Sequence, residues 1–342
     1  MSVEEVGDQL IGVFQNPALL LGIPLALAGA VFMSFGAQYQ HRGVTKVERL
    51  SGADGTSGLS GAQLKRLLTR PSWIIGTLML GLAIVCQLAA ISMAPLTVVQ
   101  PLGAIALVVT TLLNAHVSGH APTKRSLTAL IACVGGIFVF VAVAALYAVE
   151  RPIADTELLT ILAILLVVII VLGGGWLVLR HRMRALFYVI GAGILYGFVA
   201  TLAKAIIKRF QAGEFDWIMI VCVIALIAAS AVGAYFVQTA YSSGPPDLVI
   251  AGLTVVDPLV AVLIGAVILG ETSAAPPWAL VVFGVTGAVA IWGVISLARY
   301  HPQVINESQE LGIVRGSTTA AETPMGSETI SPVADPIDED DQ

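Results

Sequence analysis

The stretch Gln87-Leu-Ala-Ala-Ile-Ser-Met-Ala-Pro95 has a counterpart 151 residues further along the chain, Gln238-Thr-Ala-Tyr-Ser-Ser-Gly-Pro-Pro246. The same shift relates the whole segment 87–143 to 238–294 without a gap and aligns identical Gln, Ala, Ser, Pro, Val, Leu and Gly residues along it. Both copies lie in long apolar stretches. Because duplicated helix bundles with a site between their halves are typical of secondary transporters, the repeat predicts that architecture.

The composition is that of a membrane protein. Hydrophobic residues make up 57% of the 342 residues and charged residues only 11%, and the mean hydropathy is +0.91, whereas a soluble domain has roughly a quarter charged residues. The first sixteen residues contain no Lys or Arg, so we expect the first apolar segment to remain as a membrane helix and not to be a cleaved signal peptide. The three cysteines, which lie in apolar segments, are interpreted as small buried hydrophobes.

About twenty apolar residues are needed to cross the hydrocarbon core as a helix. Nine stretches meet this condition, and the predicted fold class is therefore an all-α polytopic membrane protein with nine transmembrane helices. The predicted spans are Pro17–Gln40, Ser72–Ser92, Ala94–Val117, Ser126–Val149, Thr156–Leu179, Ala185–Ile207, Trp217–Tyr241, Pro246–Gly270 and Pro277–Ala298.

The basic residues predict the orientation, because Lys and Arg are enriched in cytoplasmic loops. With nine spans, the larger set of basic residues falls on one side, which places the N-terminus outside, the C-terminus in the cytoplasm, and the connection 41–71 as a mobile cytoplasmic loop. The smaller set on the other side consists of Arg151, Lys204, Lys208 and Arg209.

This topology divides the chain into two repeats of opposite orientation. Each repeat has four helices, and the fifth span lies between them, so an odd number of crossings separates Gln87 from Gln238. The predicted domains are an extracytoplasmic segment (1–16), a first repeat (17–149), a connecting helix (156–179), a second repeat (185–298), and a disordered, acidic cytoplasmic tail (301–342). The tail is rich in Ser, Thr, Pro and Glu, a composition that cannot form a core.

Asp257 is the leading candidate for a functional residue, because a charge within the hydrocarbon core costs at least roughly 2.5–3.5 kcal/mol. It lies midway along the eighth predicted span, followed by Pro258. Proline lacks an N–H, which leaves the carbonyl of Thr254 without its helix partner. A carboxylate and a free carbonyl one turn apart suit a hard cation or a substrate ammonium. The alternative is a protonated carboxyl group that bonds to a neighbouring helix.

Lys204, near the end of the sixth span, has two interpretations. Its side chain either reaches the membrane interface or pairs with Asp257 or an anionic group of the substrate. Gln87 and Gln238 occupy equivalent positions in the 151-residue repeat and either bind a substrate in a shared cavity or hold helices together.

Gln100, followed by Pro101, belongs to a second, local similarity. The run 94–102 resembles 251–259 with an offset of 157 residues, which aligns Gln100 with Asp257. The 151-residue shift is retained for the architecture, so both interrupted helices bring a polar residue and a proline to the cavity, roughly 9 Å apart in depth. Gly193-x-x-x-Gly197 is interpreted as a surface for close helix packing.

These features resemble the drug/metabolite transporter superfamily. The segment 192–297 is similar to an EamA domain through Gly193-Ile-Leu-Tyr-Gly197, Lys204, Pro246 and Gly270-Glu271. The first half is similar to the NIPA magnesium-transporter branch, mainly through Ala94-Pro-Leu-Thr-Val-Val-Gln-Pro-Leu-Gly-Ala104. Where the related small multidrug resistance proteins have a membrane-embedded glutamate, this chain has Phe32 and Tyr196.

The predicted function is a secondary transporter that moves a small polar solute by alternating access, at the cell membrane. The first alternative is a magnesium or other divalent cation transporter with Asp257 as metal ligand, and the second is a membrane scaffold or receptor. No enzymatic activity is expected, since motifs such as H-E-x-x-H are absent from the sequence. We expect no cofactor, and as partners the lipid bilayer and a small-molecule or cation substrate, without nucleic acid; a homodimer stays open. The predicted substrate-binding residues are Asp257, Gln87, Gln238, Gln100, Thr254, Lys204 and Tyr196.

Overall fold

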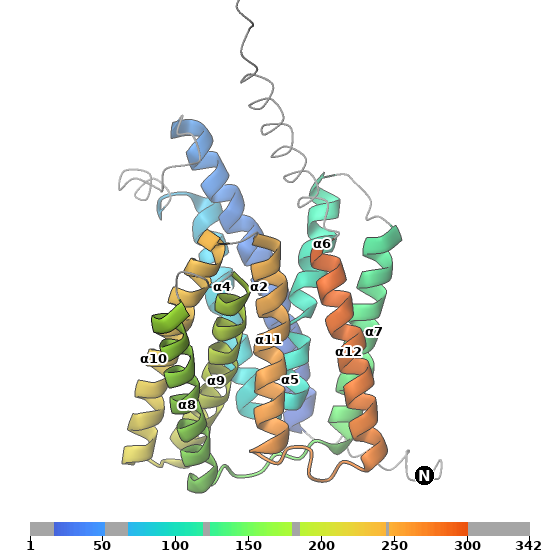
Figure 1. The fold of residues 1–342 in the computed structure, drawn as a ribbon. Helices are drawn as coiled ribbons and strands as arrows, with labels where there is room; N and C mark the ends of the chain where they lie inside the picture. Colours follow the sequence, from blue (N-terminus) through green and yellow to red (C-terminus); the bar gives the residue numbers. More distant parts are fainter. Residues whose placement is uncertain (1–16, 52–67, 119–123, 180–184, 244–245, 300–342) are drawn as a thin grey trace, which may run out of the picture. The chain divides into compact units, whose positions relative to one another are not determined.

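The backbone of the protein is built from helices. The computed structural model describes residues 17–51, 68–118, 124–179, 185–243 and 246–299, and within these ranges the ordered elements are all helical (Figure 1). The helices are α2 (Pro17–Ser51), α4 (Pro71–Met93), α5 (Leu96–Leu102), α6 (Ile105–Ser118), α7 (Lys124–Tyr147), α8 (Asp155–Leu179), α9 (Ala185–Ala212), α10 (Trp217–Ser243), α11 (Pro246–Val267) and α12 (Pro277–Arg299).

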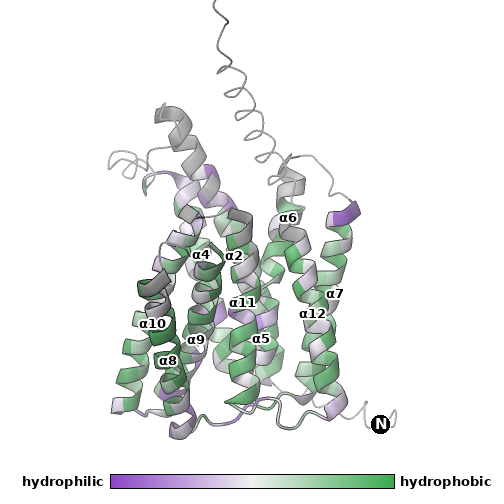
Figure 2. Cartoon of the chain, in the orientation of Figure 1, coloured by the Kyte–Doolittle hydropathy of each residue, from purple (hydrophilic) through white to green (hydrophobic). Residues whose placement is uncertain are grey.

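Most of these helices are long and apolar enough to cross a membrane. In the described part of the chain, eight segments qualify by length and composition, and Gly252–Val267 of α11 is a shorter apolar segment. Figure 2 shows hydrophobic residues along most of the length of the helices. The prediction of an all-α polytopic membrane protein is therefore confirmed, while the count of nine spans stays a prediction. The termini, predicted as an outer segment and a disordered tail, lie outside the described residues.

Two predicted segments differ from the observed ones. Helix α2 continues to Ser51 and so includes eleven residues of chain that the sequence assigned to a mobile loop. The third predicted span is broken into α5 and α6 at Gly103 and Ala104. Pro101 has no N–H to donate to the turn before it. The N–H of Gly103 donates to the carbonyl of Gln100, and that of Ala104 donates to the carbonyl of Pro101. These shorter-range bonds tighten the turn and interrupt the α-helix.

Glycines bring pairs of helices into close contact. A Cβ atom added at Gly193 would lie 2.6 Å from the Cβ of Val256, and one at Gly197 would lie 2.7 Å from the Cβ of Val260. Helices α9 and α11 thus meet at the Gly193-x-x-x-Gly197 surface, which confirms the interpretation of that motif as a packing surface. Close contacts through glycine also join α2 to α4, α9 to α10, and α7 to α12.

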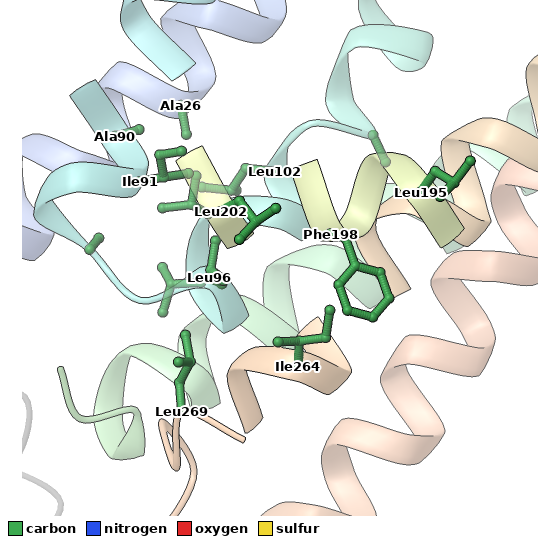
Figure 3. Packing of buried hydrophobic residues seen from close by; sticks show 14 of the residues in the cluster. Ala26, Ala90, Ile91, Leu96, Leu102, Leu195, Phe198, Leu202, Ile264 and Leu269 are labelled. Carbon is green, nitrogen blue, oxygen red and sulfur yellow. The ribbon is translucent and has the colours of Figure 1, made fainter. Parts of the chain in front are cut away.

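The buried core contains residues from both halves of the chain. Figure 3 shows apolar side chains of α2, α4 and α5 next to those of α9 and α11. The labelled members are Ala26, Ala90, Ile91, Leu96, Leu102, Leu195, Phe198, Leu202, Ile264 and Leu269. Since α5 packs against α11, the two segments that contain Gln100 and Asp257 lie in adjacent helices.

The pattern of exposure repeats between the two halves, but with a shift of 150 residues and not 151. In α4, Ala83, Cys86 and Ala90 are buried, and their counterparts in α10 after a shift of 150 are the buried Gly233, Phe236 and Ala240. The exposed residues of α7 recur on α12 with the same shift, for example Val139 and Val289. A slip of one residue turns a side chain by about 100° around a helix, so residues that match by identity need not face the same way.

The α9–α11 contact gives a prediction about stability. We expect Gly197→Ala to lower the free energy of unfolding by about 1–3 kcal/mol, because the new methyl group would overlap with Val260 and would also lie 3.0 Å from the carbonyl oxygen of Asp257. Gly135→Ala is the matched control, since a Cβ atom there meets nothing within 4 Å. Thermal unfolding in detergent measures both. Equal melting temperatures for the two variants would contradict the close α9–α11 contact.

Candidate functional site

Glu271 lies in the turn that follows α11, at the lower end of that helix in Figure 1, and is only 2% exposed. Two glycines place it there. Gly270 has φ +63°, a left-handed conformation that side chains disfavour. A Cβ atom at Gly265 would lie 2.7 Å from Oε2 of Glu271, so only glycine leaves room for the carboxylate. The chain therefore turns back at Gly270 and directs the Glu271 carboxylate into the protein.

The carboxylate of Glu271 binds the start of α5, in the other half of the chain. The N–H of Leu96 donates to Oε1 at 2.8 Å, and the N–H of Thr97 donates to Oε2 at 2.9 Å. The hydroxyl of Thr97 donates to Oε2 at 3.0 Å. These backbone N–H groups belong to the first turn of a helix and have no partner within it, so Glu271 satisfies two groups that burial would otherwise leave unbonded.

Lys204 of α9 completes this set of contacts. Its Nζ donates to Oε1 of Glu271 at 3.0 Å and to the carbonyl of Ala94 at 3.2 Å. It also forms an ion pair with Oε1 of Glu150 at 3.3 Å, and Glu150 in turn pairs with Lys208 at 3.0 Å. The ammonium group thus donates two hydrogen bonds and has a third oxygen, Oε1 of Glu150, at ion-pair distance without a hydrogen bond. We call Glu271, Lys204, Glu150 and Lys208, with the start of α5, the polar lock.

The position of Lys204 differs from two of the expectations, exposure at the membrane interface and an ion pair with Asp257. The residue is 2% exposed, so it does not extend to the interface as a solvated charge. Its ion pairs in the described part of the chain are with Glu271 and Glu150, and not with Asp257. A role of Lys204 in substrate binding stays a prediction.

A second ionic cluster lies beside the first residues of α8 and α10. Arg209 pairs with Asp155 and Asp216 at 2.6 Å each and with Glu214 at 3.4 Å. Asp216 also accepts a hydrogen bond from the N–H of Met219 in the first turn of α10. The side chain of Arg209 is buried, while its partners are more exposed. This cluster ties α8 to the α9–α10 connection.

Asp257 lies midway along α11 and is half-buried. Its Oδ1 atom is buried and has no hydrogen-bond partner among the described residues. Tyr196 of α9 is close enough for an electrostatic interaction with the carboxylate. The hydroxyl of Thr254 donates to the carbonyl of Ile250 in its own helix. Asp257 is therefore a carboxylate midway along an apolar helix, with one buried oxygen that no described group satisfies.

The three predicted glutamines do not come together as a symmetric set. Gln87 of α4 is half-buried, whereas Gln238 of α10 is exposed on the outer face of its helix. With the shift of 150 residues that the exposure pattern follows, Gln87 corresponds to Val237 and not to Gln238. The equivalence of the two glutamines holds for the sequence alone, and their role in substrate binding stays a prediction. Gln100 of α5 is 6% exposed, and among the three it is the one held in the interior beside α11.

Glu150 and Glu271 were missed as candidate functional residues. Gly270-Glu271 stands out in the sequence as a glycine and a charge at the end of an apolar span, and that signal identifies a turn. It does not identify the partners of the carboxylate, since Thr97 lies 174 residues earlier in the chain.

Comparison with known proteins gives one relative and no family assignment. An uncharacterized protein of Corynebacterium glutamicum is 27% identical over 287 residues, which cover 82% of this chain and 95% of the relative. No family model matches the chain, and no solved structure matches it. The similarity thus extends over nearly the whole of the relative and about four-fifths of this chain.

The polar lock gives a prediction about buried charge. Lys204→Met is expected to lower the free energy of unfolding by roughly 3–5 kcal/mol, because it leaves the buried Glu271 carboxylate without its cation. Lys208→Met is the control, with an expected change of about 0–1 kcal/mol because Lys208 is one-third exposed. Adding Glu271→Gln to Lys204→Met should restore part of the loss. Chemical unfolding of the wild type, Lys204→Met, Glu271→Gln and the double variant measures this coupling, and additive effects of the two single changes would show that the two residues do not interact.

Proposed function

We propose that this protein is a secondary transporter of the drug/metabolite type, which moves a small solute with a polar group by alternating access between two inverted four-helix repeats. In this proposal the helices form nine spans, the N-terminus is outside, and the C-terminus is cytoplasmic. Helix α8 connects the repeats. Transporters of this kind bind their solute near the middle of the membrane, at the interface between the repeats.

The packing of the helices supports two related halves. Helix α2 packs against α4 as α9 packs against α10, and α7 of the first half pairs with α12 of the second. The exposure pattern also recurs between α4 and α10 and between α7 and α12. With an odd number of crossings between them, two such halves run in opposite directions through the membrane.

The observation that carries the proposal is the contrast between the polar lock and Asp257. At one end of the bundle, Glu271 of the second half holds α5 of the first half through directional polar bonds. About 15 Å deeper along α11, at 1.5 Å per residue, Asp257 keeps a buried oxygen without a hydrogen bond. Oε1 of Glu150 also lacks a hydrogen bond, but it has Lys204 and Lys208 at ion-pair distance. One state of an alternating-access cycle requires a polar binding site that is closed toward one side of the membrane. The polar lock would provide that closure for a site at Asp257. Release of Glu271 would open that end.

The magnesium alternative has less support. Magnesium usually takes one or two carboxylates together with several waters. In the residues that the structure describes, no group of three or more His, Cys, Asp or Glu could hold a metal ion. Asp257 alone remains as a ligand, so this alternative rests on the resemblance of the first half to the NIPA branch.

Distance measurements by electron paramagnetic resonance test alternating access without knowledge of the solute. In a background with Cys86, Cys133 and Cys222 replaced by alanine, spin labels at Pro17 and Phe215 report the end of the bundle that carries the lock. We expect two distance populations in proteoliposomes, and a shift to the longer one in Glu271→Gln because the neutral amide binds Lys204 more weakly.

Glu214→Gln is the matched control, since Glu214 lies at the same end but is 55% exposed and outside the lock. It should leave the populations unchanged. A second label pair at Leu68 and Leu186, near the first residues of α4 and α9, should change in the opposite direction. A single unchanged distance for every variant at both pairs would overturn the proposal and favour a scaffold.

Solute flux provides a direct test of Asp257. Proteoliposomes are offered a panel of amino acids, polyamines, nucleosides and Mg²⁺, and uptake is measured for the wild type and Asp257→Asn. We expect uptake of at least one solute, and its loss in the variant, while the distance populations persist. Uptake of Mg²⁺ and of no other solute would favour the magnesium alternative. Equal uptake by the wild type and Asp257→Asn would show that Asp257 is not part of the binding site.

A further inference from the structure

A cavity lies between the two halves of the chain, apart from the polar lock. Its walls come from α5 and α7 of the first half and from α11 and α12 of the second, with Ala104 between α5 and α6. Pro101, Phe140, Pro258, Leu259, Gly287 and Ile291 are among the lining residues. Gly287 and Phe140 lie about midway along their helices, so the cavity is at the depth of the hydrocarbon core.

The walls of this cavity offer almost no polar atoms. Thr254 is the one lining residue with a polar side chain, and its hydroxyl already donates to the carbonyl of Ile250. Neither Gln87 nor Gln238 lines it. A polar solute that entered would lose its hydrogen bonds to water without replacement, which is costly. The group that this cavity takes is therefore apolar.

The size and opening of the cavity restrict that group further. Its volume is about 80 Å³, well below the roughly 300–1,000 Å³ of pockets for drug-sized ligands. A slender chain fits such a space and a compact multi-ring molecule does not. Leu259 lines the cavity and is also 42% exposed, so this residue borders both the cavity and the surface of the helix bundle.

We propose that this cavity binds the hydrocarbon chain, acyl or isoprenoid, of an amphiphilic substrate. This proposal rests on the proposed function and names the class of the transported solute. The solute would place its polar group at the Asp257 carboxylate and its hydrocarbon chain between α7, α11 and α12. Asp257 directly precedes the cavity-lining Pro258 on α11, which places the polar and apolar sites on neighbouring faces of one helix. In this proposal the hydrocarbon chain of the substrate enters the cavity from the surrounding lipid, past Leu259.

Photolabelling tests the proposal. The full chain is reconstituted in nanodiscs that contain either phosphatidylglycerol with a diazirine in its acyl chain or farnesyl phosphate with a diazirine at its apolar end. After illumination, labelled peptides are identified by mass spectrometry. We expect labels on cavity residues such as Phe140 or Ile291 to exceed those on the lipid-facing surface of α8. The probe that labels the cavity more strongly distinguishes an acyl from an isoprenoid chain.

Gly287→Leu should reduce cavity labelling to the level of α8. A Cβ atom at Gly287 would lie 3.7 Å from Phe140, an ordinary contact, and Gly287 lines the cavity, so a leucine there is expected to occupy part of its volume. Gly284→Leu is the matched control, one turn away on α12, where a Cβ atom meets nothing within 4 Å. Val262→Phe fills the cavity from α11 and serves if Gly287→Leu does not fold. Labelling that is equal in the cavity and on α8, or equal in Gly287→Leu and Gly284→Leu, would overturn the proposal.

The two proposals fail separately. If photolabelling is specific for the cavity but the spin labels show a single distance, the site for a hydrocarbon chain is supported and alternating access is rejected. If the spin labels show two distance populations but photolabelling is not specific for the cavity, the transporter proposal is supported and a hydrocarbon chain is excluded as part of the solute.

Discussion

The burial of the Glu271 carboxylate is the constraint on which much of this structure depends. A carboxylate removed from water needs partners for both of its oxygens, and their absence costs several kcal/mol. Glu271 obtains them from α5 and α9, two helices far from it in sequence. To do so it requires the left-handed Gly270, the space at Gly265, and the start of α5, where the N–H groups of the first turn have no partner within the helix. One charged group thereby fixes the relative positions of three helices and of the turn after α11.

The interactions between the halves differ along the bundle. At the end that holds Glu271 they are directional polar bonds, which weaken steeply when distance or angle changes. Deeper in the bundle, α5 meets α11 and α7 meets α12 through apolar side chains and glycine, and such contacts tolerate small sliding motions because they have no preferred angle. The proposed cycle uses this difference, because the polar bonds would be formed in one state and broken in the other. Discrete states of that kind are what an alternating-access cycle uses.

The sequence predicted the helices better than it predicted the site. Apolar length alone placed α4, α8, α10 and α12 within a few residues, since the bilayer imposes that length on every span. The break at Gly103 was missed because Pro101 within a membrane helix is compatible with a kink as well as with an interruption. The equivalence of Gln87 and Gln238 in sequence does not extend to their exposure, for a different reason. Identities follow a shift of 151 residues while exposure follows 150, and one residue of slip redirects a side chain without any change in composition. The partners of Glu271 and Lys204 are set by tertiary packing, which a single sequence does not contain.

Asp257 of α11 and Glu271 of the turn after it differ in whether their buried oxygens have hydrogen-bond partners, and that difference bears on function. Glu271 has its oxygens satisfied by groups of its own protein, so its burial is explained by the fold. Asp257 has a buried oxygen that no described group satisfies, although α9 approaches it as closely as glycine allows. A polar residue on α9 at this close contact would have provided a hydrogen-bond partner for Asp257, as Lys204 of α9 does for Glu271. In the proposed membrane topology Asp257 lies in the hydrocarbon core, where an unsatisfied carboxylate is costly, and this cost supports the proposal that a group of the solute binds it. The apolar cavity on the neighbouring face of α11 then indicates that the same incoming molecule brings a part that prefers hydrocarbon to water.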